Sequence, residues 1–230
     1  MAQKSEDWFK MRYRKVGGST IDKLTTPAKF KTLKNELISA RLEPFVFIED
    51  DKIHSKHMDR GNDLEPLARY YVSGYTGLEF KEFGWLQSNN KIFGLSPDGM
   101  TEDEKNSLEI KCPSRAVHTK YILAGNKIPS EYFWQNIAYF AVNPKLEKHF
   151  FVSYRPECAI EAHIINLERD TMTEFGCYTK NTINEYGHFY KNDPMFKTVQ
   201  KWADLLLSYV ENMDKEVDQK VDELTSKAIF

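Results

Sequence analysis

Three short strand-like runs between residues 78 and 112 constrain the fold of this chain more than any other feature. LEFKEFGWLQS and KIFGLSPDG are rich in aromatic and aliphatic residues, and Asn89-Asn90 between them favours a tight turn. The third run, from Ser107 to Cys112, follows the polar segment TEDEKNS. Because the turns between these runs are short, we expect antiparallel pairing of neighbouring strands.

Segments with helical periodicity lie on both sides of this block. AKFKTLKNELISAR, after Thr26-Pro27, and LEPLARYYVSGY precede it, and IPSEYFWQNIAYFAVNP follows it. Two further strands are expected in KHFFVSYRP and IEAHIINLER, and one long amphipathic helix carries apolar residues from Val199 to Leu224. The chain is therefore predicted to be mixed α/β, with a central mixed β-sheet flanked by helices. We expect one domain over residues 1–230, with a C-terminal helical extension over about residues 168–230.

Charge is unevenly distributed, although the formal net charge is only −2. Residues 1–41 contain ten Lys or Arg and four acids, whereas residues 203–230 contain three lysines and seven acids. The near-neutral total excludes a protein that binds nucleic acid by bulk charge. The asymmetry predicts an N-terminal region that faces a polyanion and a C-terminal helix turned away from it.

The location of the protein and its cysteine chemistry are constrained by what the sequence lacks. MAQKSEDWFK has no apolar signal core, and no run of about eighteen apolar residues occurs. We therefore expect no membrane association and a cytoplasmic location. Three cysteines without a C-x-x-C pair favour neither a disulfide framework nor a cysteine-rich zinc site.

Charged residues around Ile110 form the most informative motif. Pro97 restricts the backbone before Asp98, Gly99 permits a sharp exit, and Glu109 shares one strand face with Lys111 while Ile110 faces the core. Pairing across residues 99–106 would bring Asp98 beside Glu109. Two such carboxylates repel unless they share a proton or bind a cation.

A cation bound by these carboxylates would have a definite chemistry. Hard oxygen ligands favour Mg²⁺ or Mn²⁺, and a neighbouring lysine can orient an attacking water. Together these groups are suited to metal-assisted hydrolysis of a phosphodiester. The residues alone leave a second interpretation open, namely a solvated strand edge without a metal.

The motif and its flanks resemble a known family. LSPDGM and LEIKCP carry the Pro-Asp…Glu-x-Lys signature of the PD-(D/E)XK nuclease superfamily and are similar to phage lambda exonuclease and its YqaJ-type viral recombinase relatives. WFKMRYRKVGGST, RGNDLEPLAR and YFWQNIAYFAV resemble the family's N-terminal segment, its Gly-x-x-x-Glu helix and its glutamine-bearing helix. The resemblance extends over about residues 7–142 and implies a restriction-endonuclease-like core.

The resemblance also implies roles for individual residues. The metal ligands would be Asp98, Glu109, the backbone carbonyl of Ile110, and Glu65 through water. Lys111 would position the nucleophilic water, and Gln135 would lie against the catalytic strand. Arg12 and Ser19 match positions that hold the 5′ phosphate of a DNA end, although Val-Gly-Gly-Ser-Thr departs from the family's Ile-Thr-Ala-Ser. Other basic residues expected to contact the DNA backbone are Arg14, Lys15 and Arg115.

The function implied by the resemblance is that of an Mg²⁺-dependent exonuclease, with Mn²⁺ as a substitute. It would act 5′-to-3′ on linear double-stranded DNA ends and leave 3′ single-stranded overhangs for phage-type recombination by strand annealing. The implied partners are two further copies in a homotrimer ring and a single-strand annealing protein. The alternatives are a structure- or site-specific DNA endonuclease on the same core and a catalytically inactive DNA-end-binding module.

Overall fold

The computed structural model describes residues 5–25, 27–47, 56–174 and 196–227. Helices and strands alternate along these residues, so the prediction of a mixed α/β chain is confirmed. The elements are α1 (Glu6–Arg12), β1 (Val16–Gly17), the 3₁₀ helix η1 (Gly18–Thr25), α2 (Pro27–Leu42), α3 (Lys56–Thr76), β2 (Leu86–Gln87), β3 (Phe93–Leu95), β4 (Gly99–Met100), β5 (Asn106–Lys111), α4 (Arg115–Ala124), the 3₁₀ helix η2 (Ser130–Tyr132), α5 (Phe133–Val142), β6 (Lys148–Tyr154), β7 (Ala162–Glu168), β8 (Met172–Glu174), β9 (Phe196–Thr198) and α6 (Val199–Lys227).

The described strands form one four-stranded mixed sheet and two smaller sheets. The larger sheet has the order β4-β5-β6-β7, in which β5 and β6 are parallel and the two outer pairs are antiparallel. A small sheet has the order β1-β3-β2, and β8 pairs with β9. The chain passes from the small sheet to the larger one between β3 and β4, and Asp98 lies in this connection.

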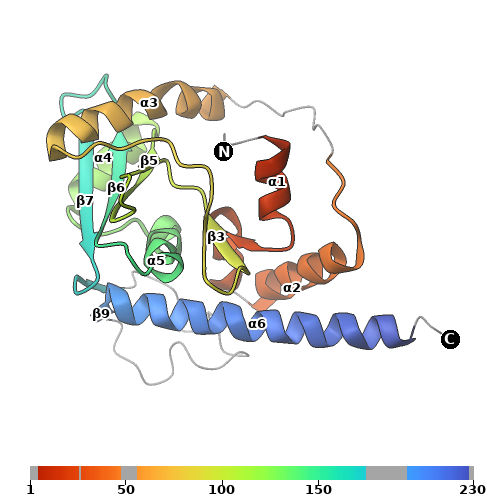
Figure 1. Cartoon of the computed structure of the whole chain (residues 1–230). Helices are drawn as coiled ribbons and strands as arrows, with labels where there is room; N and C mark the ends of the chain where they lie inside the picture. The colour runs from red at the N-terminus through yellow and green to blue at the C-terminus, as the bar shows by residue number, and fades with distance from the viewer. Residues whose placement is uncertain (1–4, 26, 48–55, 175–195, 228–230) are drawn as a thin grey trace.

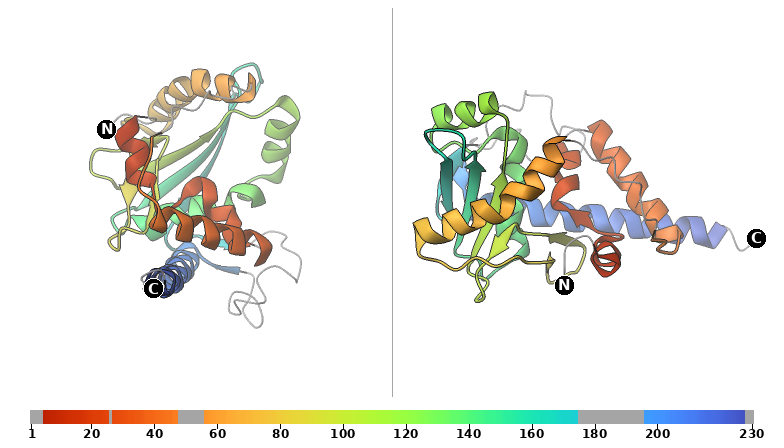
Figure 2. Two further views of the ribbon diagram at one scale, coloured as in Figure 1. Left: turned by 90° about the vertical axis from the view of Figure 1, so that its right-hand side faces the viewer. Right: turned by 90° about the horizontal axis from the view of Figure 1, so that it is seen from above.

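Helices cover both faces of the larger sheet (Figures 1 and 2). Because successive strand residues point to opposite faces, Leu108 and Ile110 of β5 pack in one apolar cluster with Ala68 of α3. Glu109, between them, faces Tyr139 of α5. Strand β5 therefore places apolar side chains under α3 and a carboxylate under α5.

The long C-terminal helix contributes to the main core. Trp202 and Leu206 of α6 are buried in the same cluster as α5, and the Trp202 ring meets Phe133 and Trp134 edge-on at 5.7 Å. Figure 1 shows α6 running along the lower side of the molecule and continuing beyond it. The predicted amphipathic helix is therefore confirmed.

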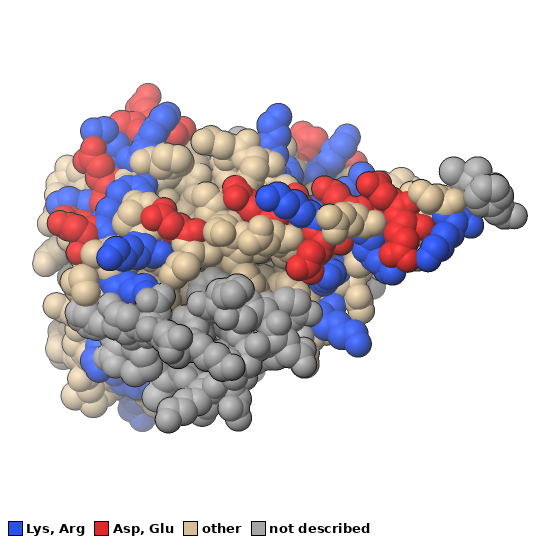
Figure 3. Space-filling model, turned by 90° about the horizontal axis from the view of Figure 1, so that it is seen from below, with Lys and Arg blue, Asp and Glu red and all other residues tan. Residues whose placement is uncertain are grey.

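The prediction that the C-terminal helix is turned away from the basic N-terminal region is wrong. Helices α2 and α6 lie side by side (Figure 1), and Arg41 of α2 forms ion pairs with Asp214 and Asp218. Lys34 of α2 pairs with Glu216 at 2.5 Å. Figure 3 shows blue and red side chains intermixed in this part of the surface. Part of the basic excess is thus neutralised by the acids of α6.

Arg41→Met is expected to lower the free energy of unfolding by about 1–2 kcal/mol, because it leaves a largely buried carboxylate without its partner. The Arg41 and Asp214 side chains are 14% and 19% exposed. Urea denaturation of the variant and the wild type measures the difference. The matched control is Lys29→Met, whose pair with Asp22 is more than half exposed and should contribute little. Equal stability of Arg41→Met and wild type would contradict the proposed contribution.

Two helices and one irregular run differ from the sequence-based expectation. Neither α1 nor α4 is predicted by periodicity. In α4, His118 and Tyr121 are buried whereas the apolar Leu123 is exposed, so apolar residues do not mark its buried face. The run over residues 78–88 forms a strand only at Leu86–Gln87, and Lys81 pairs with the larger sheet through a single bridge. Among the described helices, none is both long and apolar enough to cross a bilayer.

Candidate active site

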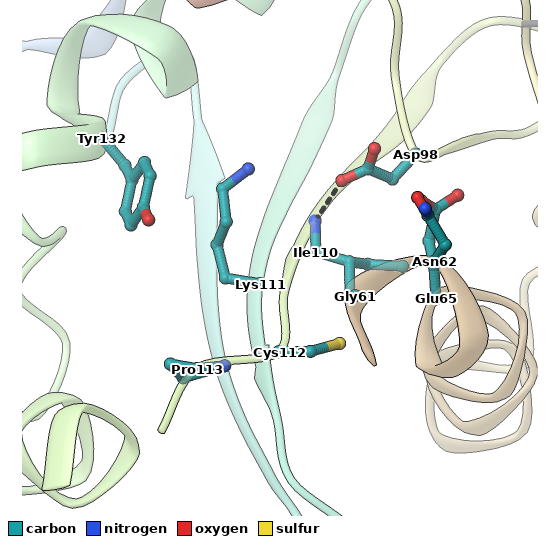
Figure 4. Close-up of a pocket in the computed structure, with 9 residues that line it drawn as sticks. All are labelled: Gly61, Asn62, Glu65, Asp98, Ile110, Lys111, Cys112, Pro113 and Tyr132. Carbon is teal, nitrogen blue, oxygen red and sulfur yellow. Dashed lines mark hydrogen bonds between the residues drawn. The ribbon is translucent and has the colours of Figure 1, made fainter. Parts of the chain in front are cut away.

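A pocket of about 430 Å³ opens between α3 and the C-terminal end of β5 (Figure 4). In the figure, the side chains of Asp98, Glu65 and Asn62 lie close together, and Lys111 extends between Asp98 and Tyr132. The pocket thus brings together residues that are distant in sequence. Its lining residues are Gly61, Asn62, Glu65, Asp98, Ile110, Lys111, Cys112, Pro113 and Tyr132.

Asp98 is fixed by β5 through two hydrogen bonds. Its carboxylate accepts from the backbone N–H of Ile110 at 2.7 Å, and its own N–H donates to the carbonyl of Leu108 at 3.1 Å. Since Gly99 pairs with Leu108, Asp98 stands opposite Glu109, as the hairpin prediction required. Gly99 lies in β4 rather than at a sharp turn. A Cβ there would be 2.9 Å from Leu108 Cδ1 and 3.3 Å from Phe80 Cβ, so a larger residue would require these side chains to shift.

Glu109 is a buried carboxylate held by three donors. The hydroxyl of Tyr139 donates to Oε2 at 2.5 Å, and Nε2 of Gln135 donates to Oε1 at 2.7 Å. The ammonium of Lys111 also donates to Oε1. Glu109 is 1% exposed, and these bonds compensate for the burial of its charge. The expected contact of Gln135 with the strand that carries Glu109 is thus observed.

The titration of the pocket reflects burial and the crowding of negative charge. Burial and the neighbouring charge of Glu109 raise the pKa of Asp98 well above its ordinary value, against the opposing effect of Lys111. Burial lowers the pKa of Lys111, but the charges of Glu109 and Asp98 outweigh this effect, so its pKa lies above the ordinary value. Lys111 therefore stays protonated beside these two carboxylates.

Glu65 is tied to Asp98 by an arginine that sequence analysis did not single out. Nη2 of Arg69 donates to Glu65 at 2.6 Å, and Nε of Arg69 donates to the backbone carbonyl of Asp98 at 2.5 Å. Arg69 lies one helical turn after Glu65 in α3. It thereby fixes the helix carboxylate relative to the connection that carries Asp98.

The oxygen donors of the pocket fit a hydrated divalent ion. Among the described residues, no three His, Cys, Asp or Glu side chains are arranged to hold a metal by themselves. Asp98, Glu65 and Ile110 line the pocket, and the Glu109 carboxylate on the adjoining face of β5 is held by its three donors. Mg²⁺ is commonly bound by one or two carboxylates and several waters. This donor set suits Mg²⁺ or Mn²⁺ better than zinc.

Arg12 is held against aromatic rings beside the glycine turn. Its guanidinium carbon lies 4.0 Å from the centre of the Trp8 ring and 5.8 Å from that of Trp85. A Cβ added to Gly17 would lie 3.8 Å from Nη2 of Arg12. The indole N–H of Trp8 donates to Ser96 Oγ at 2.8 Å. This arrangement connects α1 to the chain two residues before Asp98.

The glycine turn also adjoins the Glu109 cluster. A Cβ added to Gly18 would lie 2.7 Å from Leu95 Cδ2 and 3.6 Å from Nε2 of Gln135. That same nitrogen donates to Glu109. A residue larger than glycine would therefore force Leu95 to shift and would lie in van der Waals contact with Gln135.

The other predicted DNA contacts have different surroundings. Arg14 donates to two backbone carbonyls near the end of α2 at 2.8 and 2.7 Å, and Lys15 donates to Oε1 of Gln87 at 2.9 Å. Arg115 is exposed at the start of α4. Ser19 lies in η1, and its side chain is outside what the structure describes. Arg14 therefore has a structural contact, whereas Arg115 is open to solvent.

Sequence reasoning missed Arg69 and Tyr139, and both had a detectable signal. Each follows a predicted site residue by four positions in the same helix, Arg69 after Glu65 and Tyr139 after Gln135. Residues four apart share a helix face. A search for polar partners at this spacing would have found both.

The comparisons with known proteins agree with this fold. The family model described as YqaJ-like viral recombinase domain matches residues 7–145. No match was found among the curated proteins. The alkaline exonuclease LHK-Exo from Laribacter hongkongensis is 25% identical, with a TM-score of 0.74 and 98% of each chain covered.

Two further solved structures support the fold alone. LHK-Exo in complex with dAMP is 24% identical, with a TM-score of 0.68 and 98% of each chain covered. The phage related exonuclease from Haemophilus somnus 129PT is 14% identical, with a TM-score of 0.52, covering 93% of this chain and 96% of that one. The expected fold, a mixed α/β core flanked by helices with a long C-terminal helix, is confirmed by the likeness to LHK-Exo.

Proposed function

The chain belongs to the family of YqaJ-like viral recombinase domains, and from this premise we propose that it is a divalent-metal-dependent DNA exonuclease. It digests one strand of linear duplex DNA from the 5′ end and leaves 3′ single strands for recombination by annealing. Its similarity to an alkaline exonuclease over 98% of both chains supports exonuclease activity. Polarity and product are inferred from the family resemblance of the sequence motifs.

The observation that carries the proposal is the grouping of Asp98, Glu65 and Lys111 around one pocket, with Glu109 bonded to Lys111. The carboxylates come from α3, from the connection before β4 and from β5. A lone solvated strand edge would not need Asp98 bonded to a β5 amide or three donors on a buried Glu109.

In this proposal, Asp98, Glu109 and the carbonyl of Ile110 hold Mg²⁺, or Mn²⁺ in its place, and Glu65 contacts the ion through water. The bound ion supplies Lewis-acid stabilisation of the phosphoryl oxygens and makes a bound water easier to deprotonate.

Side chains of the chain itself supply the remaining catalytic functions. Lys111, protonated and directed into the pocket, orients the attacking water and offsets negative charge on the scissile phosphate. Gln135 keeps Glu109 in place through its amide N–H.

The 5′ phosphate is proposed to bind at Arg12 and Ser19. The guanidinium of Arg12, orientated by Trp8, offers the planar fork that suits a phosphate. The glycine turn supplies backbone amides next to it. Lys15 and Arg115 contact the phosphate backbone of the duplex. Arg14, whose side chain is exposed, makes a further contact of this kind.

Arg12→Ala is expected to reduce about tenfold the preference for 5′-phosphorylated over 5′-hydroxyl ends, because a charge-assisted hydrogen bond to phosphate is lost. Initial rates on two otherwise identical duplexes measure the preference. Lys10→Ala is the matched control, since Lys10 is an exposed cation on the same helix. An unchanged ratio in Arg12→Ala would remove Arg12 from the phosphate site.

We further propose that three copies assemble into a ring that keeps DNA enclosed, and that a single-strand annealing protein takes up the product. Both follow from the family resemblance, as does action in the host cell cytoplasm. A ring would retain DNA by topology, which accords with a net charge of only −2.

Linear and covalently closed circular duplexes separate the proposed exonuclease from its alternatives. In Mg²⁺, the protein is expected to digest the linear duplex from its 5′ ends, leaving single strands, and to leave the circle intact. Cutting of the circle would indicate an endonuclease. Retention of labelled ends without turnover would indicate a binding module.

A further inference from the structure

We propose that Tyr139 is a positioning residue, whose hydroxyl fixes the Glu109 carboxylate in the orientation that binds the divalent ion. This inference rests on the proposed function and deepens it. It concerns the preorganisation of the site before the metal and the DNA bind.

The contact itself is short and selective for one carboxylate oxygen. Tyr139 donates to Oε2 of Glu109 at 2.5 Å, whereas both Gln135 and Lys111 donate to Oε1. Within the described residues, Tyr139 is thus the only donor to Oε2. Without its hydroxyl, the carboxylate would be held at one oxygen and could rotate about its terminal bond.

Tyr139 is itself held rigidly by a buried ring. The Tyr139 and His149 rings are stacked, with centroids 4.2 Å apart and planes at 20°. The two ring nitrogens of His149 bond to Ser107 Oγ and Asn136 Oδ1, each at 2.8 Å. Tyr139, His149, Ser107 and Asn136 are each 0% exposed. A hydroxyl on such a support has little freedom to leave Glu109.

Tyr139 is connected to the proposed metal ligands through its hydrogen bond to Glu109. Its side chain is fully buried on α5 and does not line the pocket formed by α3 and β5. We therefore assign its effect to the orientation of Glu109, the carboxylate to which it donates. Partners that orient metal-binding carboxylates typically contribute about 10-fold to 100-fold in metal affinity or activity.

Tyr139→Phe removes the hydroxyl and retains the ring that stacks on His149. Tyr121→Phe is the matched control, because Tyr121 is also buried, at 3% exposed, and donates to Glu131 at 2.8 Å outside the pocket. Isothermal calorimetry with Mn²⁺ in the absence of DNA measures ion affinity. Steady-state degradation of linear duplex DNA in saturating Mg²⁺ gives kcat and KM.

The expected result is that Tyr139→Phe weakens Mn²⁺ binding about tenfold and lowers kcat about tenfold, with little change in KM for DNA. Tyr121→Phe should retain the wild-type Mn²⁺ affinity and kcat. If the wild-type protein degrades DNA and Tyr139→Phe binds Mn²⁺ as tightly as the wild type does, the inference about Tyr139 is wrong while the proposed function stands. An equal loss of Mn²⁺ affinity in Tyr139→Phe and Tyr121→Phe would also overturn the inference. Failure of the wild type to degrade DNA would overturn the proposed function as well.

Discussion

Asp98→Asn is expected to lower the rate of DNA degradation in Mg²⁺ about a thousandfold, which corresponds to several kcal/mol of lost transition-state stabilisation. Asparagine has the size of aspartate, and its side-chain oxygen can still accept the N–H of Ile110. The substitution therefore removes the charge of a proposed metal ligand while preserving the local structure. Binding of DNA ends, measured in Ca²⁺-free and Mg²⁺-free buffer, should remain.

The same variant is expected to be at least as stable as the wild type without metal. Burial and the charge of Glu109 raise the pKa of Asp98, so the ionised carboxylate is unfavourable in the metal-free pocket. Thermal unfolding in chelator measures this effect. Asp103→Asn is the matched control for nuclease activity, because Asp103 lies in the turn between β4 and β5 and does not line the pocket. Full nuclease activity in Asp98→Asn would refute the site assignment.

Lys111→Met is the second variant with a large expected effect, a fall in turnover of about 100-fold to 1,000-fold. Methionine retains much of the apolar stem but cannot orient water or offset charge on the phosphate. Gln135 and Tyr139 still hold Glu109, so the carboxylate stays bonded. Single-turnover rates on a linear duplex measure the loss.

Lys105→Met provides a comparison on the same hairpin. Lys105 is exposed just before β5 and pairs with Glu147 at 2.6 Å, away from the pocket. Its replacement should leave the rate unchanged. If Lys111→Met also cleaved at the wild-type rate, the lysine would have no role in orienting water, whatever the role of Asp98.

The placement of the charged side chains on the hairpin was predictable because strand periodicity fixes it. Residues two apart on a strand share a face, so Glu109 and Lys111 had to point together while Ile110 faced the other way. The turn between β4 and β5 then fixed Asp98 opposite Glu109. These are local relations, and they follow from spacing alone.

Long-range relations could not be predicted in the same way. Nothing in the spacing indicates that Gly18 adjoins Gln135, or that Arg41 pairs with the acids of α6. Both depend on how helices pack across the whole chain. The charge asymmetry therefore predicted two separate charged surfaces, whereas part of the basic charge of α2 is paired with acids of the adjacent α6.

The most direct test follows each strand of a linear duplex separately, with labels placed at the 5′ end, at the 3′ end and internally. In Mg²⁺, the wild type should release the 5′ label first, as mononucleotide, and the internal label later. The 3′ label should be retained in the remaining single strand. Asp98→Asn, and wild type in chelator, should release none. Release of the 3′ label first, or degradation that continues in chelator or in Asp98→Asn, would contradict a metal-dependent 5′-to-3′ exonuclease centred on this pocket.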